Sequence, residues 1–438
     1  MKVLEVLDSF YPQVDGPVNV IVNIAKALND KKLAQVDLLV PKYRKVVDVK
    51  GINIYRCPAV AAPDGYMACM PDVSPMVKDL IKNGGYDLIH VHSPFPLGKF
   101  AIRMAKKYKI PSVITVHTKF KSDFERILKS KPLQTFMLNY IMKGVNAADY
   151  VLSVSKGAGE TIREYGYKGK EIYIIRNGTD MKPSTENVDK QKEIIERYNL
   201  QNKFVFLFVG RVVENKNIQF SLEVLKKIKE KGIKNFKFLI VGSGAFEDDL
   251  KKLVKKYNLK DNVEFVGKIT DREVLATIYQ VADLFLFPST FDTCGIVVIE
   301  AAANKLASVL IKDSCASELV TDKENGLIFP EDSSIWADGI CEVMRTPEVT
   351  KKMGERAFET LYFKWEDIAL EYYNFYRDVL DGKIPKNEKP VKKAQQNKKT
   401  KADKKEKVEK KSKNIKKANP KIKTKNIKKE KGKKNGKY

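Results

Sequence analysis

The sequence predicts an α/β protein with two domains, each built on a parallel sheet that helices cover on both faces. With 438 residues, the chain is too long for one ordinary domain and long enough for two. Hydrophobic residues make up 43% of the chain, which is enough to form two cores. Short apolar runs alternate with amphipathic helical patterns, and this alternation is typical of parallel sheets with helices on both sides.

The first domain is expected to span residues 1–182. An apolar run at residues 2–7 predicts a strand, a turn follows at Asp15 and Gly16, and Pro17 stands near the start of the next helix. Apolar residues recur at helical spacing along that helix. Five further strands are expected at residues 36–40, 88–92, 112–117, 150–155 and 172–175.

The second domain is expected over residues 183–363 and begins with a charged linker at residues 183–203. Helical patterns at residues 219–231 and 248–257 separate its apolar runs. Its strands are expected at residues 204–209, 237–241, 262–265, 284–288 and 307–310. An aromatic-rich helix at residues 364–382 follows, and we expect it to pack back on the first domain. Ligands of such sheets bind beyond the carboxyl ends of the strands, so we expect the site between the two domains.

The formal net charge of +26 is concentrated at the end of the chain. Residues 383–438 contain 25 lysines and five acidic residues, which leaves a net charge of only +6 on residues 1–382. The end segment has few large apolar residues, so we expect a disordered basic tail. The five cysteines are scattered and never in C-x-x-C spacing, which argues against a disulfide framework and a zinc site. The first residues lack the pattern of a signal peptide, and a cytoplasmic location is expected.

Two cations follow the strand that ends near Val209. Gly210 and Arg211 come directly after this strand, and Lys216 lies in the same loop. Arginine offers a fork of donors and lysine a point charge, so this pair suits a diphosphate. The alternative is that Arg211 and Lys216 are solvated loop charges.

A second constellation follows the strand that ends at Pro288. A helix is expected to begin near Gly295, and the free amides at its start form an anion site. Asp292 lies at the mouth of this helix and Glu300 within it, where carboxylates can accept hydroxyl groups of a sugar or a ribose. The alternative is that Asp292 caps the helix and Glu300 is a surface residue.

Taken together, these residues resemble the retaining family-four glycosyltransferases of the GT-B fold over residues 1–380. The further motifs that carry the resemblance are Thr115 to Thr118, Ala148 and Asp149 before Ser153 to Ser155, Asn177 with Gly178, and Glu318 before Asn325 and Gly326. The resemblance implies two Rossmann-like domains with a cleft between them. The branch that glycosylates diacylglycerol or glycolipids is similar in its Asp-Thr pair followed by Gly.

The resemblance also implies a role for each site residue. Gly16 and Gly210 would lie near the donor phosphates, Arg211 and Lys216 would hold the diphosphate, and Glu300 would bind the ribose. Asp292 and the backbone of Thr293, Cys294, Gly295 and Ile296 would hold the hexose, with His117 near the transferred sugar. Asp292, His117, Arg211 and Lys216 would form the catalytic group. No metal and no cofactor are expected beyond a nucleotide-sugar co-substrate such as UDP-glucose.

Three features depart from the family pattern or have an alternative interpretation. Asp292 stands where the family usually has Glu, and Pro17 follows Gly16 where a second Gly is usual. A lone histidine at a strand end is often structural, so His117 has that alternative. We interpret His90 and His92 as structural.

Residues 119–143 and the basic tail are candidate membrane contacts. Residues 119–143 combine lysines with apolar residues at helical spacing, which fits either an inward-facing helix or one lying on an anionic membrane. Each tail lysine near such a surface contributes about 1 kcal/mol. The tail could instead bind RNA non-specifically or only solubilise the chain. It has no arginine and one aromatic residue, so recognition of specific nucleic acids is not expected.

The expected function is therefore that of a retaining, metal-independent hexosyltransferase. Its donor would be UDP-glucose or a similar UDP-hexose. Its acceptor would be diacylglycerol or a glycolipid at the cytoplasmic face of the cell membrane. One alternative is a cytoplasmic glycosyltransferase of surface polysaccharide synthesis, which acts on a glycan. An alternative of another class is a nucleic-acid-binding protein with a non-catalytic α/β body.

Overall fold

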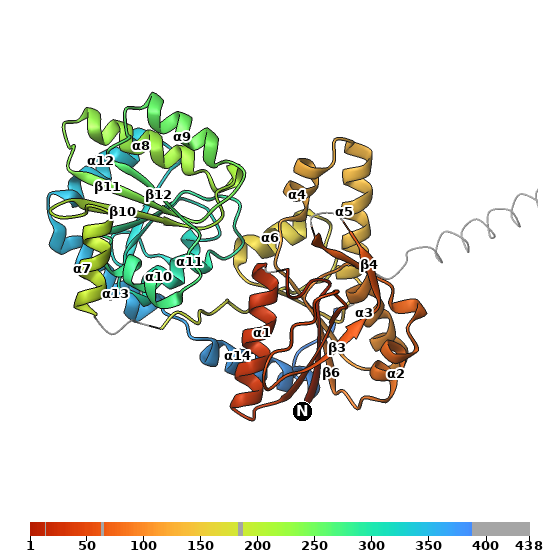
Figure 1. Cartoon of the computed structure of the whole chain (residues 1–438). Helices are drawn as coiled ribbons and strands as arrows, with labels where there is room; N and C mark the ends of the chain where they lie inside the picture. The colour runs from red at the N-terminus through yellow and green to blue at the C-terminus, as the bar shows by residue number, and fades with distance from the viewer. Residues whose placement is uncertain (14, 63–64, 183–186, 388–438) are drawn as a thin grey trace, which may run out of the picture. The chain divides into compact units, whose positions relative to one another are not determined.

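The structure is a computed structural model that describes residues 1–13, 15–62, 65–182 and 187–387. Residues 1–388 form one compact unit, which contains two separate parallel sheets (Figure 1). The tail expected at residues 383–438 lies outside the described residues from residue 388 onward. Among the described residues, no helix is long and apolar enough to cross a membrane.

The first sheet has seven strands in the order β3-β2-β1-β6-β7-β8-β9, and all neighbouring strands are parallel. The strands are β1 (Lys2–Val6), β2 (Gln35–Pro41), β3 (Asn53–Cys57), β6 (Leu88–Val91), β7 (Ser112–Val116), β8 (Tyr150–Ser153) and β9 (Tyr173–Ile174). Strand β3 was not expected, because it lies at the sheet edge and has no continuous apolar run. A small antiparallel hairpin follows it, formed by β4 (Ala59–Ala61) and β5 (Met67–Cys69).

Six helices accompany the first sheet. They are α1 (Gly16–Asp30), α2 (Pro75–Asn83), α3 (Pro96–Tyr108), α4 (Phe120–Ile127), α5 (Lys131–Val145) and α6 (Lys156–Glu164). Helix α1 begins where the sequence predicts it, because the Asp15 carboxylate accepts a hydrogen bond from the Val18 amide and Pro17 occupies the first turn. Its apolar face, including Ile21 and Ile24, is fully buried.

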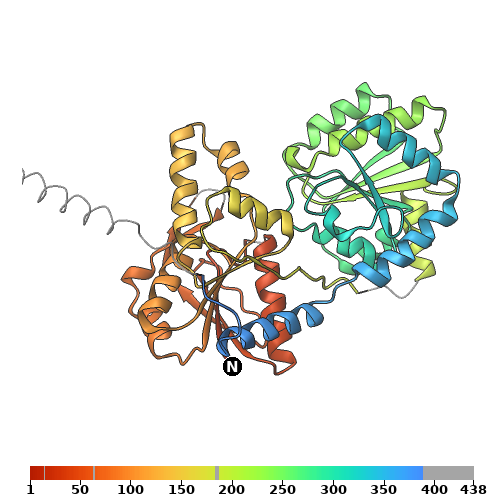
Figure 2. The same ribbon diagram turned by 180° about the vertical axis from the view of Figure 1, so that it is seen from behind.

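The second sheet has six parallel strands in the order β12-β11-β10-β13-β14-β15. The strands are β10 (Phe204–Val209), β11 (Phe236–Val241), β12 (Val263–Gly267), β13 (Leu284–Phe287), β14 (Ser308–Ile311) and β15 (Gly326–Phe329). The helices are α7 (Val188–Arg197), α8 (Ile218–Glu230), α9 (Glu247–Lys256), α10 (Arg272–Gln280), α11 (Ile296–Ala303), α12 (Ser333–Met344) and α13 (Pro347–Leu361). Helices α8, α9 and α12 cover one face of this sheet, and α7, α10, α11 and α13 cover the other (Figures 1 and 2).

The last helix, α14 (Trp365–Leu380), packs against α1 of the first sheet. Its side chains Trp365, Ile368, Tyr372 and Tyr376 are buried in the same core as that helix. This arrangement agrees with the expectation for residues 364–382, because the aromatic face of the helix needs an apolar surface.

Ordered structure continues beyond residue 382, so the predicted start of the tail at residue 383 is too early. The Tyr150 hydroxyl donates to the backbone carbonyl of Ile384 at 3.4 Å. The backbone N–H of Asn387 donates to the backbone carbonyl of Asp149 at 2.9 Å. Ile384 also packs on the first core. The packing of Ile384 and the backbone bonds of residues 384 and 387 therefore extend the ordered segment beyond residue 382.

Candidate functional site

Lys216 and Asp292 meet although they are 76 residues apart in the chain. Strand β10 ends at Val209, and the 3₁₀ turn η3 (Glu214–Lys216) carries the lysine. The Lys216 Nζ lies 2.5 Å from Oδ1 of Asp292, and their side chains are only 13% and 21% exposed. Lys216 is therefore not a freely solvated loop charge.

Asp292 has one carboxylate oxygen engaged and one without a partner. Its Oδ2 is buried and accepts no hydrogen bond from any residue that the structure describes. Asp292 does not cap α11, because the N-cap position is Gly295 and no side chain bonds to the first turn. That alternative interpretation is wrong, and the free oxygen is available to a hydroxyl group of a ligand.

The start of α11 is built around Gly295. This residue has a φ of 70° and is buried, and a Cβ there would lie 2.9 Å from the Ala316 Cβ. Because the helix begins without a side-chain cap, its first amides lack intrahelical partners. Cys294 is buried in a small apolar cluster, and burial raises the pKa of its thiol to about 11. Cys294 can therefore contact a ligand through its backbone rather than its sulfur.

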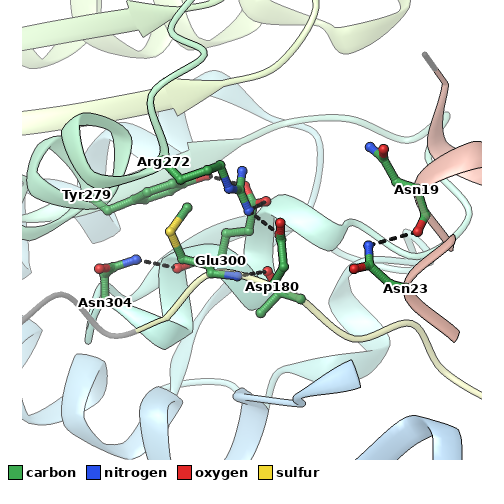
Figure 3. Close-up of polar contacts among 9 residues, drawn as sticks. Asn19, Asn23, Asp180, Arg272, Tyr279, Glu300 and Asn304 are labelled. Atoms are coloured by element: carbon green, nitrogen blue, oxygen red, sulfur yellow. Dashed lines mark hydrogen bonds and ion pairs between the residues drawn. The ribbon is translucent and has the colours of Figure 1, made fainter. Parts of the chain in front are cut away.

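Glu300 is buried, so its interpretation as a surface residue is wrong (Figure 3). Its Oε1 accepts from the Arg272 guanidinium at 2.9 Å, and its Oε2 accepts from the Tyr279 hydroxyl at 3.1 Å. Arg272 also pairs with Asp180 at 2.5 Å. Burial raises the pKa of Glu300, and the bonds from Arg272 and Tyr279 oppose that rise. A ribose would therefore have to share this carboxylate with two residues that sequence reasoning missed.

Gly210 lies where two loops approach closely, and Arg211 follows it. A Cβ on Gly242, after β11, would lie 1.8 Å from the carbonyl oxygen of Gly210, after β10. The close approach of the two loops therefore requires glycine at position 242. Arg211 is exposed and forms no ion pair within the described part of the chain. Burial raises the pKa of the Asp15 carboxyl, and the charge of Arg211 is among the influences that oppose the rise. Arg211 is thus close enough to act on the turn that precedes Gly16.

Gly16 opens α1 with free space around it. The residue is exposed, and an added Cβ would meet no atom within 4 Å. The space beside Gly16 is consistent with access for a ligand, although Pro17 supplies no backbone N–H.

His117 follows β7 and contacts the loop that carries Asp292. Its carbonyl oxygen accepts from the Thr293 hydroxyl at 2.9 Å. Its Nε2 lies 3.0 Å from Nδ1 of His92, and the two rings stack with centroids 5.3 Å apart. Burial lowers the pKa of His117 to about 4, so its ring is neutral at pH 7. The bond from Thr293 thus joins His117 to the loop that carries Asp292, and the roles of these residues stay predictions.

A pocket of about 390 Å³ adjoins this group. Its lining includes Asn215, Thr290 and Phe291, which neighbour Lys216 and Asp292 in the chain, and Lys119, which follows His117. Lys119 donates to the Thr290 carbonyl at 2.8 Å. A larger pocket of about 490 Å³ lies at the opposite, amino end of β10, and its lining contains none of the predicted site residues.

In the described part of the chain, one group of side chains has the geometry of a metal site. Ligand atoms of Glu5, His90 and His92 lie within 4.8 Å of one another, and all three residues are buried. Both ring nitrogens of His90 already have partners, Tyr376 at 2.6 Å and Thr115 at 2.8 Å. His90 is therefore held by hydrogen bonds on both ring nitrogens, and sequence reasoning missed the link from His92 to His117.

Comparisons with known proteins show the family of the chain. The family model for glycosyl transferases group 1 matches residues 190–360, and that for glycosyltransferase family 4 matches residues 14–182. The alpha-monoglucosyldiacylglycerol synthase of Acholeplasma laidlawii is 27% identical over 319 residues, which cover 70% of this chain and 78% of the relative. The synthase of the same name from Streptococcus pneumoniae is 24% identical over 382 residues, or 85% of each chain. The crystal structure of Anabaena HepE in complex with UDP matches with a TM-score of 0.69 at 18% identity, covering 86% of this chain and 100% of HepE.

Proposed function

Since the chain belongs to the family-four glycosyltransferases of the GT-B fold, we propose that it transfers a hexose from a UDP-sugar, such as UDP-glucose, to a lipid acceptor with retention of configuration. The observation that carries this proposal is the Lys216–Asp292 pair, with one carboxylate oxygen left free. Lys216 can then contact both Asp292, which would hold the hexose, and the diphosphate of the departing UDP.

In this proposal Arg211, Lys216 and the first turn of α11 stabilise the charge that a metal ion would otherwise neutralise. The leaving diphosphate gains negative charge as its bond to the sugar breaks. Arg211 and Lys216 stabilise that charge, and the first amides of α11 add donors of fixed orientation. Arg211 suits this role because it is exposed and forms no ion pair among the described residues.

In this proposal one carboxylate of the protein binds the hexose and another binds the ribose. Oδ2 of Asp292 accepts a sugar hydroxyl, the backbone from Thr293 to Ile296 lies against the sugar, and His117 contacts it. Glu300 binds the ribose and exchanges its bonds with Arg272 or Tyr279 for bonds to the diol. The relatives from A. laidlawii and S. pneumoniae are named as diacylglycerol glucosyl synthases, which supports glucose as the hexose and diacylglycerol or a glycolipid as the acceptor.

A membrane-facing surface on α4 and α5 supports the lipid acceptor. Phe120, Phe124, Ile141 and Met142 are buried, as the inward-facing interpretation of residues 119–143 requires. That interpretation does not account for three exposed apolar side chains, Ile127 at 60%, Leu133 at 44% and Phe136 at 64%. Exposed lysines at 129 and 131 stand beside them. We propose that this surface and the basic tail hold the enzyme on the cytoplasmic face of an anionic membrane.

The test is a panel of radiolabelled nucleotide sugars incubated with the protein and extracted lipids, with products resolved by chromatography. A labelled lipid from one donor, absent with Asp292→Asn, is expected. Transfer to soluble glycans alone would instead favour polysaccharide synthesis. Absence of transfer from every donor would reject the proposed activity.

A further inference from the structure

A chain of buried polar groups runs from α14 and β1 to His117. The Tyr376 hydroxyl donates to Oε1 of Glu5 at 3.4 Å. Oε2 of Glu5 lies 3.7 Å from Nε2 of His92, and Nδ1 of His92 lies 3.0 Å from Nε2 of His117. Glu5 and His92 have no exposed side-chain surface.

Two atoms in this chain face each other without a partner. Oε2 of Glu5 and Nε2 of His92 are both buried and form no hydrogen bond to any described residue. Leaving a buried polar atom unpaired destabilises the fold. A small closure of the 3.7 Å gap would satisfy both atoms at once, provided that one of them carries a proton.

We propose that Glu5 and His92 are positioning residues that hold His117 in the tautomer protonated on Nδ1, so that His117 presents an N–H donor to its ligand. The identity of that ligand as the transferred sugar rests on the proposed function. The tautomer itself does not, because it rests on the contacts of His92 with Glu5 and His117 and on the proton that buried Glu5 retains.

The count of protons gives this tautomer. Burial raises the pKa of Glu5 to about 8, so the carboxyl is mainly neutral at pH 7. Burial lowers the pKa of both His92 and His117, so each ring carries one proton. The Tyr376 hydroxyl lies 2.6 Å from Nδ1 of His90 and donates to Oε1 of Glu5, so the N–H of that His90 nitrogen is the donor to Tyr376. The carboxyl proton of Glu5 then lies on Oε2 and faces Nε2 of His92, which accepts it once the 3.7 Å gap closes. His92 then carries its proton on Nδ1 and donates it to Nε2 of His117.

The remaining proton of His117 must therefore lie on Nδ1. Among the described residues this nitrogen has no hydrogen-bond partner, so it is available to a ligand. If His117 carried its proton on Nε2, it would donate to Nδ1 of His92, and His92 would carry its own proton on Nε2. The carboxyl proton of Glu5 would then have to move to Oε1, where Tyr376 already donates.

The experiment uses the full chain with ¹⁵N-labelled histidine rings, since the protein has only three histidines. Two-bond ¹H–¹⁵N spectra at pH 7 report the tautomer of each ring, and His117→Gln assigns its signals. His117 is expected as a single Nδ1–H tautomer. Glu5→Gln should preserve it, because the amide can still donate to His92, whereas Glu5→Leu and His92→Phe should produce a mixture. Asp37→Leu, which removes another buried carboxyl of the same sheet, should leave His117 unchanged.

Kinetics provide the second measurement. Glu5→Leu and His92→Phe should each lower kcat about tenfold with little change in the donor KM, and Glu5→Gln should restore kcat. An Nε2–H tautomer in the wild type, an unchanged His117 in both disruptive variants, or a stoichiometric metal bound by the purified chain would overturn the inference. If no sugar is transferred but the spectra follow the expected pattern, the proposed function fails and the positioning role remains.

Discussion

The Nζ atom of Lys216 lies 2.5 Å from Oδ1 of Asp292, in a pair that is largely shielded from solvent. The lysine follows β10 and the aspartate follows β13, and these two strands are neighbours in the second sheet. The carboxyl ends of parallel strands meet at one edge, so the topology of the sheet brings the two residues together.

Removing either Lys216 or Arg211, the two cations that we propose bind the diphosphate, should impair catalysis strongly. Lys216→Ala and Arg211→Ala should each lower kcat/KM by an amount equivalent to about 2–4 kcal/mol, because the leaving diphosphate would lose a charge-stabilising donor. Steady-state kinetics with varied donor measure this loss. The matched control is Lys226→Ala, which removes a partly exposed lysine on α8 that pairs with Glu230 and lies over the Tyr257 ring, and it should change little. Equal activity of Lys216→Ala and Lys226→Ala would refute the assignment.

Glu300→Gln should raise the KM for the donor strongly, and it should lower the free energy of unfolding only slightly. A carboxylate offers a diol two acceptor atoms, and an amide keeps only one. Stability should fall modestly, because Arg272 is 43% exposed and retains its pair with Asp180. Donor kinetics and thermal unfolding separate the two effects. The exposed Glu273 provides a control through Glu273→Gln. The role in ribose binding is wrong if the variant binds donor as the wild type does.

Removing residues 388–438 should weaken vesicle binding and leave the transfer of sugar nearly intact. The deletion starts after Asn387 so that the packed residues of the body are kept. Binding to vesicles of anionic lipid, measured by co-sedimentation at low and high salt, should fall and become less sensitive to salt.

The surface on α4 and α5 should provide the membrane affinity that remains after this deletion. Phe136→Ser in the truncated chain should reduce it further, whereas Val349→Ser, at an exposed position on α13, should not. Equal vesicle binding by the full-length and the truncated protein would show that the tail does not contribute to membrane binding. Tight binding of RNA without vesicle binding would assign the tail to nucleic acid.

The stability of the protein should depend on pH through Glu5. Its pKa is about 8 in the folded chain and near its ordinary value of 4.5 in the unfolded chain. Between these values the folded state holds a proton that the unfolded state has lost, so the free energy of unfolding falls as pH rises. Glu5→Gln lacks this proton, and its stability should fall less over the same range. Urea unfolding between pH 5 and 8 measures both proteins, whose histidines contribute alike. Parallel curves would contradict the raised pKa.

Sequence reasoning predicted the strands that are buried on both faces, because these form continuous apolar runs. It missed β3, whose edge position leaves its residues partly exposed, and β15, a four-residue strand that begins at Gly326. In the site, sequence reasoning selected Lys216, Asp292 and Glu300 from their places after the strands together with the family resemblance, and their roles stay predictions. It could not identify Arg272 as the partner of Glu300 or Glu5 as a neighbour of His92, because those contacts depend on how α10, α11, β1 and β6 pack.

The central claim is best tested by the product formed from UDP-glucose and diacylglycerol in the presence of EDTA. The account predicts a glucolipid whose anomeric configuration, determined by NMR, is the same as that of the donor. It also predicts that Asp292→Asn forms none. A product of inverted configuration, or transfer that depends strictly on added divalent metal, would contradict the account.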